Sequence, residues 1–150
     1  MITSKWVLFI KKSSKDILRF ETLSDLKNKR IGFIRGYNYP SNFKDYVEKH
    51  SLVQEVSKET QNIAKLLLGR FDYMPAVIET TLYLAKNNPE LKKLYAYNNI
   101  YYFPTPIATT DFYLMFSRKT VNKTFVDQFS KALTEFKTTG SYREIIKKYQ

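Results

Sequence analysis

Apolar residues between positions 31 and 97 recur at two spacings, one typical of buried strands and the other typical of amphipathic helices. Ile31 to Ile34 is a short apolar run rich in β-branched side chains, which predicts a strand. Phe43, Tyr46 and Val47 stand three and four residues apart, the period of one helical face. The same reading predicts strands at 31–34, 53–56, 71–74 and 94–97, and helices from 40 to 49, from a Ser57 cap to Gly69, and from Pro75 to Asn87-Asn88-Pro89. This alternation predicts an α/β unit with a parallel sheet, whose ligands bind beyond the carboxyl ends of the strands.

Further strands and helices are predicted outside this repeat. Trp6 to Lys11 and Phe112 to Phe116 are apolar runs that predict two strands outside the repeat, near the two ends of the chain. We expect these two strands to pair, one leading into the repeat and one leading out. Two pairs have the capping-box spacing that starts a helical turn, Thr22 with Asp25 and Ser141 with Glu144. Apolar stripes mark two C-terminal helices, the first predicted to end at Gly140; their members are Phe125, Phe129, Ala132, Leu133 and Phe136, then Tyr142, Ile145, Ile146 and Tyr149. Two such helices need a surface to cover.

Composition narrows the class of protein. The 150 residues are 43% hydrophobic and 16% aromatic, which favours one folded domain over a disordered chain. The longest strongly apolar runs are far shorter than the about 20 residues of a membrane span, and the first ten residues do not read as a secretory signal. The absence of cysteine excludes disulfides and thiolate metal sites, and His50, the single histidine, leaves little scope for histidine catalysis. Because no nucleophile elbow, P-loop or dinucleotide-binding motif is present, we expect neither an enzyme nor a bound cofactor.

The net charge of +11, from 25 basic and 14 acidic residues, raises the question of an acidic partner. The basic excess is concentrated in residues 1–35 and spread thinly elsewhere. No stripe of basic residues interleaved with aromatic residues is legible, so solvated lysines are the plainer explanation. A basic α/β domain that binds nucleic acid or an anionic surface remains the alternative function.

Four stretches resemble the bacterial extracellular solute-binding proteins of family 3, which serve polar amino-acid ABC transporters. Residues 23–36, LSDLKNKRIGFIRG, are similar to the start of the family's second lobe, and residues 67–73, LLGRFDY, to its "L..GR.D" turn from helix to strand. Residues 112–117 are similar to the family's return crossover strand, and residues 129–149 to its closing helices. Four motifs in the family's order, across nearly the whole chain, make the resemblance fairly specific.

The resemblance implies the type II periplasmic-binding-protein-like fold, in which two α/β lobes joined by two crossover strands hold a solute between them. It implies that residues 10–112 form lobe two, with a parallel-rich sheet flanked by helices, and that the first lobe is missing from the 1–150 chain. Residues 113–150 then hold C-terminal helices that normally pack on lobe one, so their apolar stripes are expected to be exposed. Such stripes would dock on lobe two, pair with a second copy as a homodimer, or receive a missing segment.

The function that the resemblance implies is noncatalytic binding of a small polar solute, for an ABC transporter or a related sensor. The implied partners are the solute, an amino acid or a larger ring-bearing analogue, and the membrane subunits of the transporter. A single lobe supplies half of the contacts, so we expect weak binding or none from this chain alone. The implied location is periplasmic or extracellular.

The implied site begins at the loop Gly36-Tyr37-Asn38-Tyr39-Pro40, which follows the first strand of lobe two. In the family this loop leads into a helix N-terminus, whose free N–H groups and dipole favour an anionic group. Family members carry small residues there, whereas this chain carries Tyr37, Asn38 and Tyr39, which suit a larger polar or ring-bearing solute. Ordinary packing of Tyr37 and Tyr39 at the start of the helix is the other explanation.

Two charged residues complete the predicted site. Members that take α-amino acids place an Asp five residues after the Asp of "GR.D", where this chain has Val77. Glu79 could replace that ammonium partner, although a helical glutamate is more often solvated. Arg35 could reach an anion of the solute with two hydrogen bonds, although a surface arginine beside a turn is also common. Asp72, the Asp of the motif itself, is expected to be structural.

Overall fold

The computed structural model describes residues 2–147 and divides into two compact units. The larger unit runs from Thr3 to Thr110, and the smaller unit holds residues 111–147 together with Ile2. Within residues 2–147, no helix combines the length and apolar character needed to cross a membrane. The predicted helical position of Tyr149 lies outside the described residues.

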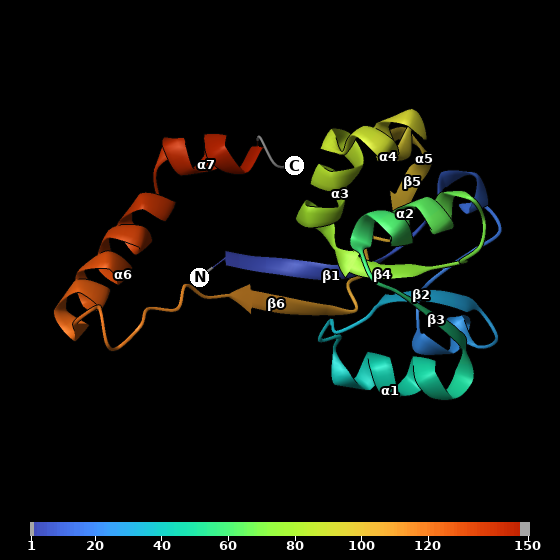
Figure 1. Cartoon of the computed structure of the whole chain (residues 1–150), viewed down its shortest axis with the longest axis horizontal. Coiled ribbons are helices and arrows are strands. Elements are labelled where there is room, and N and C mark those ends of the chain that lie inside the picture. Colours follow the sequence, from blue (N-terminus) through green and yellow to red (C-terminus); the bar gives the residue numbers. More distant parts are fainter. Residues whose placement is uncertain (1, 148–150) are drawn as a thin grey trace. The chain divides into compact units, whose positions relative to one another are not determined.

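Strand β1, Ile2–Lys11, is the centre of a sheet in the larger unit. It pairs in antiparallel fashion with β4, Met74–Val77, and with β5, Ile100–Tyr102, and it also pairs with β6, Ala108–Phe112 (Figure 1). The expected pairing of the entry strand with the exit strand is therefore confirmed, although the exit strand is shifted. The other neighbours of β1, β4 and β5, come from distant segments of the chain, which a local apolar run cannot reveal.

The β–α–β alternation is confirmed where it was clearest in the sequence. Strands β2, Arg30–Ile34, and β3, Leu52–Val56, pair in parallel, and helix α1, Ser41–His50, connects them. Ile31 adds a parallel bridge to Tyr73, just before β4. The fold thus belongs to the predicted α/β class. Its strand pairing is mixed, because β2 and β3 are parallel whereas β4 and β5 run antiparallel to β1.

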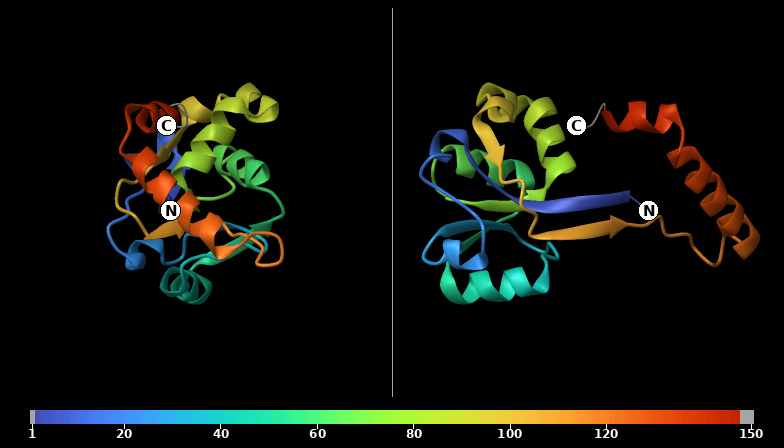
Figure 2. Two further views of the ribbon diagram at one scale, coloured as in Figure 1. Left: turned by 90° about the vertical axis from the view of Figure 1, so that its left-hand side faces the viewer. Right: turned by 180° about the vertical axis from the view of Figure 1, so that it is seen from behind.

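Helices cover both sides of these strands. Helix α1 lies on one side of β2 and β3, and the other side carries α2, Glu59–Leu67, α3, Ile78–Asn87, α4, Pro89–Lys93, and α5, Ala96–Asn99 (Figures 1 and 2). Two single 3₁₀ turns, Lys12–Ser14 and Leu23–Leu26, complete the larger unit. The predicted capping box of Thr22 and Asp25 is present at the second of these turns.

The core of the larger unit follows the two-residue period of β1. Val7 and Phe9 join the cluster that includes residues of α2 and α3, whereas Trp6, Leu8 and Ile10 join the cluster that includes residues of α1. Val7 to Ile10 are fully buried. A strand buried on both faces is expected to read as a continuous apolar run, which is how this segment reads in the sequence.

Several predicted boundaries were wrong. Pro75 lies inside β4, opposite Leu8, and helix α3 begins at Ile78; proline fits this strand only where its missing N–H is not needed. Lys58 occupies the N-cap position of α2, and Ser57 contacts the side chain of Gln61 instead.

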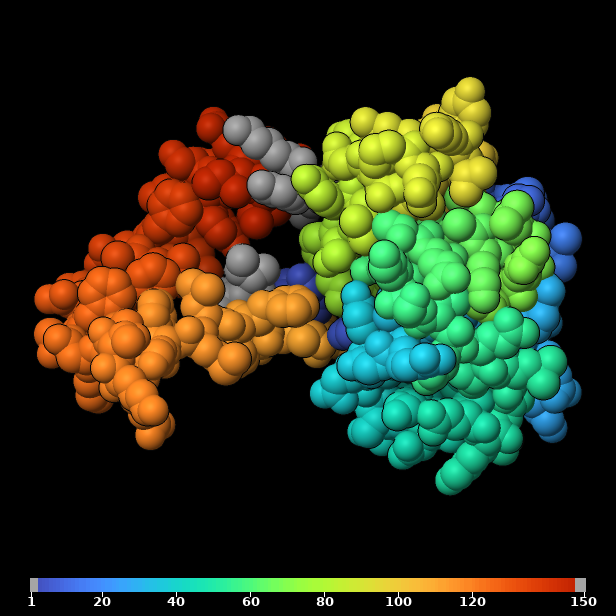
Figure 3. All heavy atoms as spheres, viewed as in Figure 1, coloured from blue at the N-terminus to red at the C-terminus, as the bar shows by residue number. Residues whose placement is uncertain are grey.

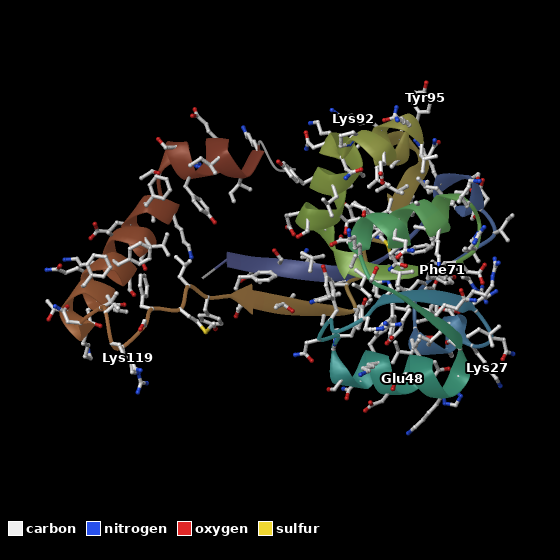
Figure 4. All side chains as sticks on the ribbon, viewed as in Figure 1. Lys27, Glu48, Phe71, Lys92, Tyr95 and Lys119 are labelled. Carbon is white, nitrogen blue, oxygen red and sulfur yellow. The ribbon has the colours of Figure 1, made fainter. Side chains whose placement is uncertain are left out.

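The predicted strand at 94–97 is also absent. Tyr95 has a left-handed φ of 51° and points away from the unit (Figure 4), and the chain forms α5 before β5 begins at Ile100. The exit strand is shifted as well, since β6 ends at Phe112, the residue at which the predicted strand begins.

The smaller unit contains α6, Lys123–Lys137, and α7, Gly140–Lys147. Neither helix holds a buried residue. In the apolar stripes Phe125, Phe136 and Ile145 are exposed, while Phe129, Leu133, Tyr142 and Ile146 are partly covered. Phe116 packs against Phe129 of α6, with ring centroids 5.2 Å apart.

The caps of these two helices differ from the prediction. Helix α6 ends at Lys137, so Gly140 begins α7 instead of terminating α6. Ser141 lies inside α7, and the hydroxyl of Thr139 accepts the hydrogen bond from the N–H of Tyr142 at 3.3 Å. A hydroxyl two residues earlier therefore takes the capping role.

Candidate functional site

The loop after β2 is a tight turn that leads into α1 at the surface of the larger unit (Figure 3). Gly36 has a φ of +80°, a conformation that residues with a side chain rarely adopt. The N–H of Tyr37 donates to the carbonyl of Ile34 at 3.2 Å and closes the turn. Pro40 is the N-cap of α1, which has no side-chain cap and no acidic residue in its first turn. The first N–H groups of α1 therefore have neither a capping side chain nor a first-turn carboxylate as a partner that would compete with a ligand.

Arg35 and Asn38 are both exposed on this loop. The Nε atom of Arg35 lies 3.3 Å from Oε2 of Glu55 in β3, in an ion pair between two exposed side chains. Such a pair contributes at most about 1 kcal/mol and breaks easily. Arg35 is therefore held against β3 in this structure but is free to exchange this partner for another anion.

Tyr39 is a core residue. Its side chain is 5% exposed, and its hydroxyl oxygen accepts a hydrogen bond from the N–H of Ile34 at 2.8 Å. Its ring stacks on Phe33 with centroids 4.3 Å apart and meets the edge of Trp6 at 5.2 Å. Burial raises the pKa of Tyr39 well above its ordinary value. Of the two explanations for this tyrosine, packing at the start of the helix describes its position.

Tyr37 is the aromatic residue of the loop that remains accessible, with 45% of its surface exposed. Its hydroxyl donates to Oε2 of Glu59 at 3.5 Å, a long contact that joins the loop to the first turn of α2. Partial burial raises the pKa of Tyr37, and the nearby charge of Glu59 raises it further. The phenol therefore stays protonated near neutral pH and remains a hydrogen-bond donor.

Glu59 is a functional candidate that the sequence reading missed. The side chain is 8% exposed, and Oε1 accepts a hydrogen bond of 2.6 Å from the hydroxyl of Thr81 in α3. Burial raises the pKa of Glu59, while the hydrogen bonds from Thr81 and Tyr37 lower it in part. In the sequence, Glu59 is an ordinary acidic residue in a first helical turn, so nothing signalled its burial beside the loop.

Glu79 lies in the first turn of α3, two residues before Thr81. Its Oε2 atom is buried, and within residues 2–147 it has no hydrogen-bond partner. The structure thus connects Tyr37, Glu59 and Thr81 through side-chain hydrogen bonds, whereas Glu79 and Arg35 stand outside that connection.

Asp72 is structural, as predicted. Its carboxylate accepts hydrogen bonds from Arg30 at the backbone N–H, at Nε and at Nη2, the last at 2.6 Å. Burial pushes the pKa of Asp72 upward, but the hydrogen bonds and charge of Arg30 outweigh it, and the pKa lies below its ordinary value. This pair fixes the turn before β4 to the start of β2.

A cavity of about 340 Å³ opens beside the start of α1. Its walls come from three segments, 20–23, 40–43 and 105–108. None of the predicted site residues (Arg35, Gly36, Tyr37, Asn38, Tyr39 and Glu79) lines this cavity. No group of three His, Asp or Glu side chains within the described part of the chain is placed to hold a metal ion.

Comparisons with known proteins give a fold but no close relative. No family model matches the chain, and no curated protein matches it by sequence. Among solved structures, a mutant of ArgBP from T. maritima is 18% identical with a TM-score of 0.69, and 99% of this chain covers 58% of that chain. The second substrate-binding domain of a putative amino acid ABC transporter from Streptococcus pneumoniae is 20% identical, with a TM-score of 0.65 and coverages of 99% and 61%. An ancestral arginine-binding protein bound to arginine is 21% identical, with a TM-score of 0.59 and the same two coverages.

These neighbours agree in kind, since they are substrate-binding proteins or domains of amino acid transport systems. Nearly the whole of this chain matches about three fifths of each, so the chain spans less than two thirds of their length. At this level of identity the likeness establishes architecture. The chain therefore has the type II periplasmic-binding-protein fold that its sequence motifs predicted.

Proposed function

We propose that the larger unit binds a small polar solute without chemical conversion, as one lobe of a binding protein for an ABC transporter or a related sensor. The observation that carries the proposal is the loop Gly36 to Pro40, which ends parallel strand β2 and starts helix α1. Ligands of α/β sheets bind at the carboxyl ends of strands, and an uncapped helix start without acidic residues favours an anionic group there.

The accessible side chains of the loop supply polar contacts for such a solute. Tyr37 offers an exposed ring and a phenolic donor, and Asn38 offers an amide. Arg35 can leave its exposed partner Glu55 to pair with an anionic group. Tyr39 contributes indirectly, because its hydroxyl holds the backbone of the turn at Ile34.

The solved neighbours support an amino acid as the first solute to try, since ArgBP and the ancestral arginine-binding protein are named for arginine. The chain spans only part of those proteins, so half of the contacts of a closed site are expected to be missing. Of the two outcomes expected for a single lobe, weak binding or none, the accessible loop favours weak binding, with affinities in the millimolar range. We propose two further partners, the membrane subunits of the transporter and a second copy of the chain at the smaller unit. We also propose that the protein acts in the periplasm or outside the cell.

Amide NMR spectra of the full chain test this function. Titration with arginine, glutamine, glutamate and histidine is expected to give saturable shifts at residues 35–42 for at least one of them. Tyr37→Ala should weaken that binding, and Leu52→Ala, an exposed residue at the far end of β3, should leave it unchanged. Spectra that stay unchanged for every one of these solutes up to about 20 mM would contradict the proposal.

A further inference from the structure

Glu59 is a buried carboxyl group without a cationic partner. Within residues 2–147 it forms no ion pair, and its hydrogen bonds come from two hydroxyls, Thr81 at 2.6 Å and Tyr37 at 3.5 Å. Only the first is a strong contact, so Oε2 is left with weak compensation. A carboxylate removed from water is costly unless it is paired, and the dipole of α2 offsets only part of that cost.

The carboxyl group of Glu59 faces the candidate loop. Its poorly compensated oxygen points to Tyr37, the exposed aromatic residue of the candidate loop. A rotation of the Tyr37 side chain would uncover Oε2 at the loop.

Few other groups at the strand ends can pair with a positive charge. Val77, the last residue of β4, is aliphatic. Arg35, the cation of the loop, is already paired with Glu55. Glu59 is consequently the carboxylate that the hydrogen bonds connect to the loop.

We propose that Glu59 receives the cationic group of the solute, an ammonium or a guanidinium, and that Tyr37 is the movable cover over it. This inference rests on the proposed function, because it presumes a solute at the loop. A cation in place of the long contact to the Tyr37 hydroxyl would form a charge-assisted hydrogen bond and remove the uncompensated charge. The solute class is then a small polar molecule with at least one cationic group.

The test compares three probes by NMR titration of the full chain. L-arginine carries two cationic groups, N-acetyl-L-arginine retains only the guanidinium, and L-citrulline retains only the ammonium. Glu59→Gln keeps an acceptor for Thr81 and removes the charge, and Glu48→Gln removes the same charge from an exposed pair with Lys44 on α1. We expect Glu59→Gln to weaken L-arginine binding at least about tenfold, whereas Glu48→Gln changes it less than about threefold. If N-acetyl-L-arginine loses affinity to the same extent in Glu59→Gln, then Glu59 receives the guanidinium. If L-citrulline does, Glu59 receives the ammonium.

The outcomes separate this inference from the proposed function. Saturable arginine binding to the wild type that is equally strong in Glu59→Gln overturns the role of Glu59 and leaves solute binding intact. Absence of binding of all three probes to the wild type overturns the inference about Glu59, whereas the proposed function is overturned only if glutamine, glutamate and histidine also fail to bind. If Glu59→Gln does not fold, the titration of the wild type with arginine still tests the inference. Bound arginine must shift the amide signals of Tyr37 and Thr81, and unchanged amide signals at both residues overturn the inference.

Discussion

Gly32 lies at the contact between β2 and α2, directly beneath the strand end that presents the candidate loop. A Cβ atom at this position would come closer than 3.0 Å to Oδ1 of Asn62 and to the ring of Phe71. Both neighbours are buried. The Nδ2 group of Asn62 also donates to the carbonyl of Gly32 at 2.9 Å. Neither side chain can move away without losing a contact.

The cost of Gly32→Ala follows from these contacts. Overpacking a well-filled core costs about 1–3 kcal/mol, and a disturbed hydrogen bond between Asn62 and Gly32 adds about 1 kcal/mol. Replacing a strand glycine with alanine returns about 0.5–1 kcal/mol of backbone entropy. We expect a net loss of about 2–3 kcal/mol in the free energy of unfolding. For a unit of this size, that loss lowers the melting temperature by about 10–20 °C.

Urea unfolding followed by circular dichroism measures this loss. Gly140→Ala is the matched control, because its Cβ meets no atom within 4 Å, and it should change stability by less than about 0.5 kcal/mol. A Gly32→Ala protein as stable as the control would refute the packing described for β2 and α2.

Three further predictions concern the loop, the turn before β4 and the basic charge. Tyr39→Phe leaves the buried N–H of Ile34 without its acceptor and should lower the free energy of unfolding by about 1–3 kcal/mol in urea, whereas Tyr37→Phe should cost less than about 0.5 kcal/mol. Because the pKa of Asp72 lies below its unfolded value of 3.8, its contribution is present above that pH and disappears as the pH falls through the folded value. Asp72→Asn should therefore lower the urea midpoint at pH 7 and have a shrinking effect below about pH 4; an equal effect at both pH values would contradict the Arg30 pairing. If solvated lysines account for the charge of +11, single-stranded RNA should show no retarded band at physiological salt, and a band that weakens steeply with salt would favour the nucleic-acid alternative.

The sequence predicted most reliably where local signals agree. The predicted bounds of β2, α1 and β3 agree with the structure to within one or two residues. The apolar period, the proline and the turn residues all indicate the same boundaries in this segment. The helix start predicted at Pro75 and the strand predicted around Tyr95 were wrong. Pro75 resembles a helix start but is tolerated in β4, and Tyr95 adopts a left-handed φ that interrupts an apparently strand-forming run.

The candidate site was predictable as a loop but not as a set of contacts. The position of Gly36 to Pro40 between a strand and a helix follows from the sequence. Which tyrosine remains exposed does not follow, because Tyr37 and Tyr39 have the same chemistry and stand two residues apart. The packing of Tyr39 between Trp6 and Phe33 decides it.

The order β2–α1–β3, the motif at Asp72 and the class of fold were determined by the sequence itself, because periodicity and turn chemistry act over a few residues. The central place of β1, the mixed pairing around it and the burial of Glu59 beside Tyr37 were decided only by tertiary structure. These features join residues more than twenty positions apart, and an ordinary first-turn glutamate becomes a buried carboxylate only when α3 and the loop close over it.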